Sequence, residues 1–261
     1  MPGAVYNCRV AAAVRSSVRF YAELNDFLPP ARRAREIPCE TDRTSVKDLI
    51  ERFGVPHTEV DLVLVNGEPV DFGYLVRDGD RVSVYPVFES IDIAGVSKVR
   101  PEPLRELTFV VDCHLGKLAR YLRMLGFDTR YENDWDDEEL ARISAVEGRV
   151  LLTRDRGLLK RSGVERGYCV RSDDLEAQLA ELMRRFDLAR IVQPFRRCPR
   201  CNGLLGQVDK AAILHRLEPL TREHYDEFRE CADCGQIYWQ GTHYEQLAAL
   251  LGRVMEEDGG L

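Results

Sequence analysis

The sequence contains no uninterrupted apolar stretch near the ~18 residues that a membrane-spanning helix requires. It also shows no signal peptide, because the first residues, Met-Pro-Gly-Ala, do not place a basic segment ahead of an apolar one. These two absences argue against a membrane protein and a secreted protein, and we expect a cytoplasmic one. The 8 cysteines should then be reduced, so cysteines at paired spacing favour a metal site over disulfides.

An excess of positive charge is missing as well. The formal net charge of the 261 residues is −7, which argues against a protein that binds nucleic acid over its whole surface. Residues 141–210 are an exception, with 15 Lys and Arg against 9 Asp and Glu. Such a local basic field can hold phosphates beside an acidic metal site, although arginines on helices can also be ordinary solvated surface. The length predicts two or three domains, and the 44% hydrophobic content is sufficient for globular cores.

The first unit, residues 1–91, combines strand patterns with one helical pattern. Five short segments have the composition or alternation of strands: 18–22, 34–39, 61–65, 68–70 and 81–85. Between the second and the third, Thr44 or Ser45 can cap a helix, and Asn66-Gly67 marks a hairpin turn. Strand, strand, helix and further strands is the order of a β-grasp fold.

The segments TSVKDLIERFGVPHTEVDLVLVNGEPV and LVRDGDRVSVYP resemble the ubiquitin-like, sulfur-carrier group of β-grasp proteins. Those carriers work through a free C-terminal Gly-Gly, whereas this chain continues beyond Pro86 without one. The resemblance therefore implies a binding or scaffolding unit with a protein partner, and not carrier chemistry. Residues 92–105 lack periodicity, contain Pro101 and Pro103, and are expected to form a linker.

The central unit contains two apolar runs that end at acidic residues. Residues 107–111 stop at Asp112, and residues 150–153 stop shortly before Asp155. Such runs are typical of strands buried on both faces of a parallel sheet, and neighbouring parallel strands bring their carboxyl ends to one edge. A third acidic group, which includes Asp137, begins the second of the two helical patterns between these strands. Three converging carboxylates would form an oxygen site suited to magnesium or manganese.

These acids also have structural explanations. Residues 136–139 can complement the dipole of the helix that they begin, and Asp112 and Asp155 can act as caps if a helix starts directly after each. Cys113-His114 suggests a nucleophile and a base, but adjacent residues on a strand point to opposite faces, which argues against that chemistry. Carboxylates side by side repel when no cation is bound. The metal interpretation therefore predicts that Asp112→Asn and Asp155→Asn melt at or above the native temperature without added metal, while any catalysis at this site falls by orders of magnitude.

Basic residues lie close in sequence to both acidic strand ends. A helix predicted over residues 115–125 places leucines on one face and Lys117, Arg120 and Arg123 on the other. Arg154 and Arg156 flank the second acidic strand end. Arginine suits bidentate contact with phosphate, so these side chains are candidates to hold phosphates next to the acids.

The whole central unit, residues 106–194, is predicted to be an α/β domain with a small parallel sheet flanked by helices. Further strand patterns lie at residues 127–131 and 168–170. Asp173 or Asp174 then caps a final amphipathic helix.

The C-terminal unit, residues 195–261, is expected to end in a helix, and it carries two Cys-x-x-Cys knuckles separated by 29 residues. Their thiolates can complete one tetrahedral zinc site, which is structural because four sulfurs leave no open position. The predicted ligands are Cys198, Cys201, Cys231 and Cys234. Tyr238 and Trp239 follow the second knuckle and can either stack on nucleic acid or pack over the zinc site.

The segments FVVDCHLGKLARYLRMLGFDTRY, DDEELARISAVEGRVLLTRDRGLLKR and CPRCNG with CADCGQIYWQGTHYEQL resemble the Mut-seven C-terminal ribonuclease family. The resemblance covers nearly the whole chain. It implies a PIN-like nuclease domain followed by a zinc ribbon, and metal-dependent cleavage of RNA. By position it implies Asp112, Asp137 and Asp155 as the acidic ligands of magnesium or manganese, with Asp174 or else Asp173 as a fourth acid.

The substrate implied by such an open edge is single-stranded or looped RNA. Magnesium or manganese would lower the pKa of a bound water and orient it for in-line attack on a phosphodiester. Two other functions fit the same residues. One is a non-catalytic module that binds RNA or a ribosomal partner, with structural acids, and the other is a DNA nuclease with the same site.

Overall fold

The computed structural model describes residues 13–86, 96–99, 106–241, 245, 249–250 and 252–253. The chain divides into two compact units, Met1–Pro103 and Leu104–Leu261. Most of the predicted linker at 92–105 and most of the C-terminal helix predicted after the ribbon lie outside the described residues. No described helix is both long enough and apolar enough to cross a lipid bilayer.

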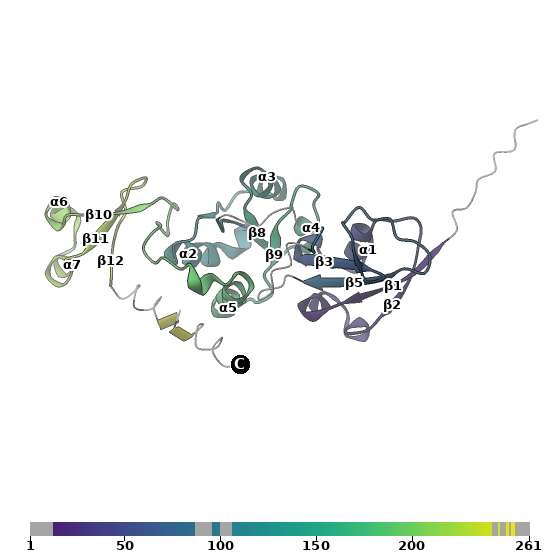
Figure 1. The fold of residues 1–261 in the computed structure, drawn as a ribbon. Helices are drawn as coiled ribbons and strands as arrows, with labels where there is room; N and C mark the ends of the chain where they lie inside the picture. The colour runs from purple at the N-terminus through teal and green to yellow at the C-terminus, as the bar shows by residue number, and fades with distance from the viewer. Residues whose placement is uncertain are drawn as a thin grey trace, which may run out of the picture. The chain divides into compact units, whose positions relative to one another are not determined.

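The first unit is built on a five-stranded mixed sheet with the order β2-β1-β5-β3-β4 (Figure 1). Its strands are β1 (Val14–Phe20), β2 (Ile37–Thr41), β3 (Val60–Val65), β4 (Glu68–Pro69) and β5 (Arg81–Pro86). Strands β1 and β5 run parallel at the centre, while the other pairs are antiparallel. This arrangement with one helix is β-grasp-like, as the sequence predicts.

Local signals define the helix and the hairpin of the first unit. Helix α1 (Val46–Arg52) begins at Ser45, whose side chain accepts a hydrogen bond from the Asp48 backbone N–H. Its apolar face packs Leu49 and Ile50 into the core. Asn66 and Gly67 both have positive φ, 53° and 91°, as a tight hairpin turn requires.

Strand β1 begins four residues earlier than the sequence predicts, at Val14 instead of Val18. Its first residues pair with β2, where Val14 lies opposite Thr41 and Ser16 opposite Cys39. Residues 15–17 are polar, and only Ser16 among them is buried, so the apolar alternation used for the prediction is weak there. Backbone pairing, and not burial, extends this strand.

The second unit contains a four-stranded sheet with the order β7-β6-β8-β9. Its strands are β6 (Phe109–Val111), β7 (Thr129–Arg130), β8 (Val150–Thr153) and β9 (Gly167–Cys169). All three neighbouring pairs are parallel, which confirms the predicted sheet. Val111 lies opposite Leu152, so the next residues at the carboxyl edge are Asp112 on one strand and Thr153 on its neighbour.

Helices cover both faces of this sheet (Figure 1). They are α2 (Gly116–Met124), α3 (Asp137–Glu147), α4 (Arg156–Leu159) and α5 (Leu175–Phe186). The core on one face joins Phe109 and Leu152 of the sheet to leucines of α2 and α5. Helix α3 contacts β6 and β8 and buries Leu140 and Ile143, whereas Val146 is exposed.

The ribbon at the end of the second unit is a three-stranded antiparallel sheet with the order β10-β11-β12. Its strands are β10 (Leu205–Val208), β11 (Phe228–Cys231) and β12 (Ile237–Trp239), and α6 (Lys210–Ile213) and α7 (Pro219–His224) lie between the first two. The first knuckle precedes β10, and the second is the turn from β11 to β12.

Candidate functional site

Asp112 lies at the carboxyl edge of the parallel sheet, directly after β6, and only 6% of its surface is exposed. The Thr153 hydroxyl donates a hydrogen bond of 2.6 Å to Asp112 Oδ2. The same hydroxyl oxygen accepts from the Asp155 backbone N–H at 2.9 Å. Thr153 is fully buried and links the two acidic strand ends. The sequence analysis missed it, although the predicted pairing of the strands places it beside Asp112.

The pKa of Asp112 lies below its usual value. Burial raises it, but hydrogen bonds from Thr153, Cys113 and His114 favour the charged form and lower it further than burial raises it. The carboxylate is therefore ionised at neutral pH while almost enclosed by protein. An ionised, buried carboxylate is the form that binds a divalent cation.

Cys113 and His114 were expected on a strand, but in the structure they do not lie on one. They begin a 3-10 helix, Cys113–Leu115, and Cys113 Sγ lies 3.5 Å from His114 Nδ1. Burial and the neighbouring Asp112 raise the pKa of the Cys113 thiol, so the thiolate that a nucleophile requires is disfavoured. Nucleophilic chemistry here is thus opposed by electrostatics and not by side-chain direction.

The other predicted acids do not gather around Asp112 at ligand distance. Within the described part of the chain, the potential metal ligands clustered with Asp112 are Cys113 and His114, with ligand atoms within 4.8 Å of one another. Asp137 is exposed and forms an ion pair of 3.5 Å with Arg161. Among the residues described, no three of the predicted carboxylates have ligand atoms within 4.8 Å of one another, so their convergence on one ion stays a prediction.

The acids stay apart because a helical turn starts immediately after each strand end, so that Asp112 and Asp155 can act as helix caps. Asp112 caps the 3-10 helix, and Asp155 caps α4 with Oδ1 accepting from the Gly157 N–H at 2.6 Å. The Asp155 side chain is thereby directed to its own helix. Asp174 likewise caps α5, which decides between the two predicted caps. Asp173 instead pairs with Arg154.

The five predicted phosphate-binding residues have different environments. Lys117 and Arg120 are exposed on α2, and Arg156 is exposed on α4. Arg154 is exposed and paired with Asp173. The prediction that Arg123 binds phosphate is wrong, because this side chain is 6% exposed and does not share the solvent face of α2.

The Arg123 guanidinium binds backbone carbonyls of two segments. It donates to Thr129 O at 2.8 Å and Tyr131 O at 3.3 Å, and to Arg200 O at 2.9 Å and Pro199 O at 3.4 Å in the first knuckle. Arg123 therefore fastens the first cysteine knuckle to the parallel sheet, and it is not available to a phosphate. Its position after a leucine within a basic helix gives no sequence signal of this role.

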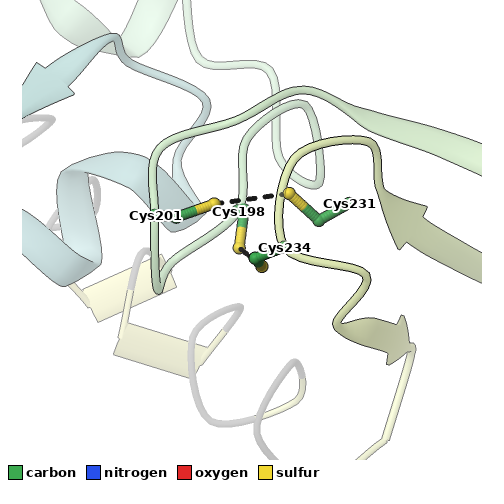
Figure 2. A group of neighbouring side chains, drawn as sticks. All are labelled: Cys198, Cys201, Cys231 and Cys234. Carbon is green, nitrogen blue, oxygen red and sulfur yellow. Dashed lines mark hydrogen bonds between the residues drawn. The ribbon is translucent and has the colours of Figure 1, made fainter.

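The four predicted zinc ligands come together in space (Figure 2). Their sulfur atoms lie within 4.8 Å of one another, with 3.4 Å between Cys201 and Cys231 and 3.7 Å between Cys198 and Cys234. Each knuckle supplies one cysteine to each of these pairs. This arrangement is compatible with the predicted zinc ribbon.

The two knuckles repeat the same backbone hydrogen bonds. Cys198 N donates to Gly203 O at 2.8 Å and Asn202 N to Cys198 O at 2.9 Å. The equivalent bonds in the second knuckle, Cys231 N to Gln236 O and Gly235 N to Cys231 O, measure 3.0 and 2.9 Å. Asn202 and Gly235 both have positive φ, 71° and 67°. This turn aims both cysteines of a knuckle at one point.

The first knuckle also has chemistry suited to a metal. Burial raises the pKa of Cys198, but hydrogen bonds from Tyr238 and from backbone N–H groups outweigh it and lower that pKa to about 7. Tyr238 Oη lies 3.0 Å from Cys198 Sγ. A thiol that ionises near neutral pH is a ready zinc ligand.

Asn202 connects this knuckle to the sheet as well. Its side-chain oxygen accepts from Thr129 N at 3.0 Å, and its amide donates to Asp128 Oδ1 at 2.9 Å. Arg149 and Arg197 complete the network on Asp128, whose pKa their charges help to lower against the effect of burial. Knuckle and sheet edge thus form one continuous hydrogen-bonded structure.

Comparison with known proteins gives two family matches. The family model described as the Mut7-C RNAse domain matches residues 107–251, and the model described as Mut7-C ubiquitin matches residues 13–92. A search of curated proteins gives no match. The first match spans more than half of the chain, from the Asp112 edge through both cysteine knuckles. The chain therefore belongs to the Mut7-C ribonuclease family and carries the ubiquitin-like domain of that family at its N-terminal end.

Proposed function

We propose that this protein is a PIN-like, metal-dependent ribonuclease that hydrolyses RNA phosphodiester bonds at the Asp112 edge of its parallel sheet. The observation that carries the proposal is the buried, ionised Asp112 carboxylate at that edge, in a domain of a ribonuclease family. Open α/β sheets place their active sites at this edge.

The acidic residues fit a magnesium or manganese ion that keeps much of its water. Such ions are commonly bound through one or two carboxylates, with water in the remaining positions. Asp112 would hold the ion directly, and Asp155 and Asp137 would act on its waters, with Asp174 as a fourth acid. When bound, the ion would supply an activated water and stabilise charge on the leaving oxygen. The four cysteines would hold a structural zinc.

Basic side chains would orient the RNA at this edge. Lys117, Arg120 and Arg156 are exposed, and Arg154 can exchange its partner Asp173 for a phosphate. Arginine offers a planar fork of donors that matches phosphate geometry. We propose single-stranded or looped RNA, because splayed bases reach such an open surface more easily than a duplex does.

We propose the division suggested by the sequence: a β-grasp domain over 1–91, a linker over 92–105, a nuclease domain over 106–194, and a zinc ribbon with a C-terminal helix over 195–261. The two family matches, which together leave residues 93–106 between them, support it. A protein partner is proposed for the β-grasp domain.

The test is cleavage of labelled RNA and DNA pools by the full chain, with and without added manganese or magnesium. Asp112→Asn should reduce RNA cleavage by orders of magnitude. A matched control is Asp226→Asn, which removes the same charge from a side chain that is 90% exposed and paired with Lys210. Absence of metal-dependent cleavage would favour a binding module with structural acids, and preferential cleavage of DNA would identify a DNA nuclease.

A further inference from the structure

A pocket of about 370 Å³ lies between α2 and the two cysteine knuckles. It is lined by Arg120, Pro199, Arg200, Gln236 and Tyr238. We propose that this pocket binds one nucleotide of single-stranded RNA, with its phosphate on the two arginines and its base on Tyr238. This inference rests on the proposed function and adds to it a substrate site that the nuclease domain and the ribbon build together.

The charge of the pocket suits a phosphate. Its lining contains two arginines and no carboxylate. Among the described residues neither Arg120 nor Arg200 forms an ion pair, whereas other arginines of the second unit, such as Arg142 and Arg149, are held by carboxylates. Both free guanidinium groups are exposed and can form bidentate contacts.

Tyr238 provides a fixed aromatic surface beside these arginines. It lies on β12, is half-buried, and its hydroxyl contacts Cys198 Sγ at 3.0 Å. The ring is thereby held by both the strand and the zinc knuckle. A base can stack on such a ring whatever its identity, because every base has a π-face. Gln236 adds an amide that can contact the edge of the base.

Arg123 holds the two walls of the pocket together. It lies three residues after Arg120 on α2, about one helical turn further along, but it is buried whereas Arg120 is exposed. Its guanidinium binds the carbonyls of Pro199 and Arg200, the two knuckle residues in the opposite wall. Arg123 is thus a positioning residue, and the pocket needs little rearrangement to accept a ligand.

Helix α2 links this pocket to the acidic edge. The helix begins at Gly116, shortly after Asp112, and Arg120 lies about 6 Å further along its axis. An RNA strand that places a phosphate on Arg120 and Arg200 would therefore pass close to the Asp112 edge. The pocket would fix the register of the strand relative to the cleaved bond.

The test is binding of a fluorescent single-stranded oligouridine to the zinc-loaded full chain, measured by anisotropy over a salt series without magnesium or manganese. Arg120→Ala and Arg200→Ala should each weaken binding about tenfold and lower the slope of log K against log salt by about 0.7. Arg190→Ala removes the same charge from an exposed arginine outside the pocket and should change neither quantity. Equal weakening by all three variants would show that RNA is attracted by the general positive charge of the surface, and it would contradict a specific binding pocket.

A second arm tests the aromatic surface. Tyr238→Leu should weaken binding about 5- to 150-fold with little change in the salt slope, while Tyr238→Phe, which keeps the ring, should bind as the native chain does. Zinc content must equal that of the native chain in both variants; Tyr238→Phe is the decisive variant if Tyr238→Leu loses zinc. Weakening by Tyr238→Phe equal to that by Arg120→Ala would contradict stacking.

The experiments can reject the nucleotide pocket and the proposed ribonuclease function independently of each other. Asp112→Asn, which alters no residue of the pocket, should bind the oligouridine as tightly as the native chain does. Loss of binding in the arginine variants without any cleavage by the native chain would reject the nuclease and keep the pocket. Metal-dependent cleavage by the native chain together with undiminished binding in the arginine variants would support the nuclease and reject the pocket.

Discussion

At the scale of single residues, the proposed active site depends on the hydrogen bond between Asp112 and Thr153. The carboxylate is stabilised in its charged form by donors on its own turn and on the neighbouring strand. The sequence predicts mutual repulsion of strand-end acids and therefore a gain in stability when Asp112 becomes Asn. The structure leads to the opposite prediction, because hydrogen bonds stabilise the negative charge of Asp112.

Asp112→Asn should lower the free energy of unfolding of the metal-free protein by about 1–3 kcal/mol, since a charge-assisted hydrogen bond is lost. The stabilisation by the charged form is complete above the ordinary carboxyl pKa near ~3.9 and is lost as the pH falls through the depressed value. Urea denaturation at neutral pH measures the change. A variant as stable as the native chain, or more stable, would restore the repulsion argument.

Thr153→Val should shift the acid limb of the pH–rate profile for RNA cleavage to higher pH. The change removes the hydroxyl that lowers the pKa of Asp112, so the carboxylate takes up a proton at a higher pH and loses its metal earlier. Thr153→Ser keeps the donor and should leave the profile close to that of the native chain. A uniform loss of rate at every pH would indicate a packing defect instead.

At the scale of elements, the ribbon and the parallel sheet depend on each other. Arg123, Asn202 and Asp128 connect the first knuckle to β7 and to the end of α2. Gln193 N also donates to Leu125 O at 2.9 Å, where the close approach of the Gln193 carbonyl to Gly126 leaves no room for a side chain at that position. Zinc binding in the knuckle should therefore stabilise the nuclease sheet.

Arg123→Ala should lower the free energy of unfolding by about 3 kcal/mol, because four buried or partly buried backbone carbonyls lose a donor. Arg123→Lys should not restore it, since an ammonium cannot reproduce the fork of a guanidinium. Arg120→Ala, on the exposed face of the same helix, is the control and should change stability by less than ~0.5 kcal/mol. Denaturant melts of the three variants provide the comparison.

Elemental analysis should find one zinc per chain, and Cys201→Ser should lower that content. Chelation of the zinc should lower the melting temperature of the second unit as a whole, because the knuckle is bonded to the sheet. Cys39→Ser removes a half-buried cysteine of the first unit, outside the cluster, and should leave zinc and melting unchanged. Zinc-free native protein with the same melting temperature would reject a metal role for the four cysteines.

At the scale of the whole molecule, the chain consists of two compact units that divide between Pro103 and Leu104. Each has its own sheet and its own buried side chains. The acidic edge, the knuckles and the nucleotide pocket all belong to the second unit. The first unit is therefore expected to act on partner or substrate choice and not on the chemistry of cleavage.

A chain that starts at Leu104 should fold, retain zinc and cleave RNA at a rate within a few-fold of the full chain. The matched control is the same truncation carrying Asp112→Asn, which should be folded and inactive. Circular dichroism and zinc content report folding independently of activity. A folded, zinc-loaded but inactive truncation would show that the β-grasp unit contributes to the substrate site.

The sequence by itself determined the features that rest on local patterns. Apolar runs predicted the parallel strands, polar residues at 44–45 and 136–139 marked two helix starts, and paired cysteines indicated one metal site, because each signal lies within a few neighbouring residues. Only the tertiary structure decided which residues of distant segments contact one another, and in which direction the side chain of Asp155 lies. The strand register placed Thr153 beside Asp112, the turns after the strands directed Asp155 to its own helix, and docking of the knuckle buried Arg123. The contacts of Thr153 with Asp112 and of Arg123 with Arg200 join residues 41 and 77 positions apart, and nothing in the local pattern around either partner indicates the other.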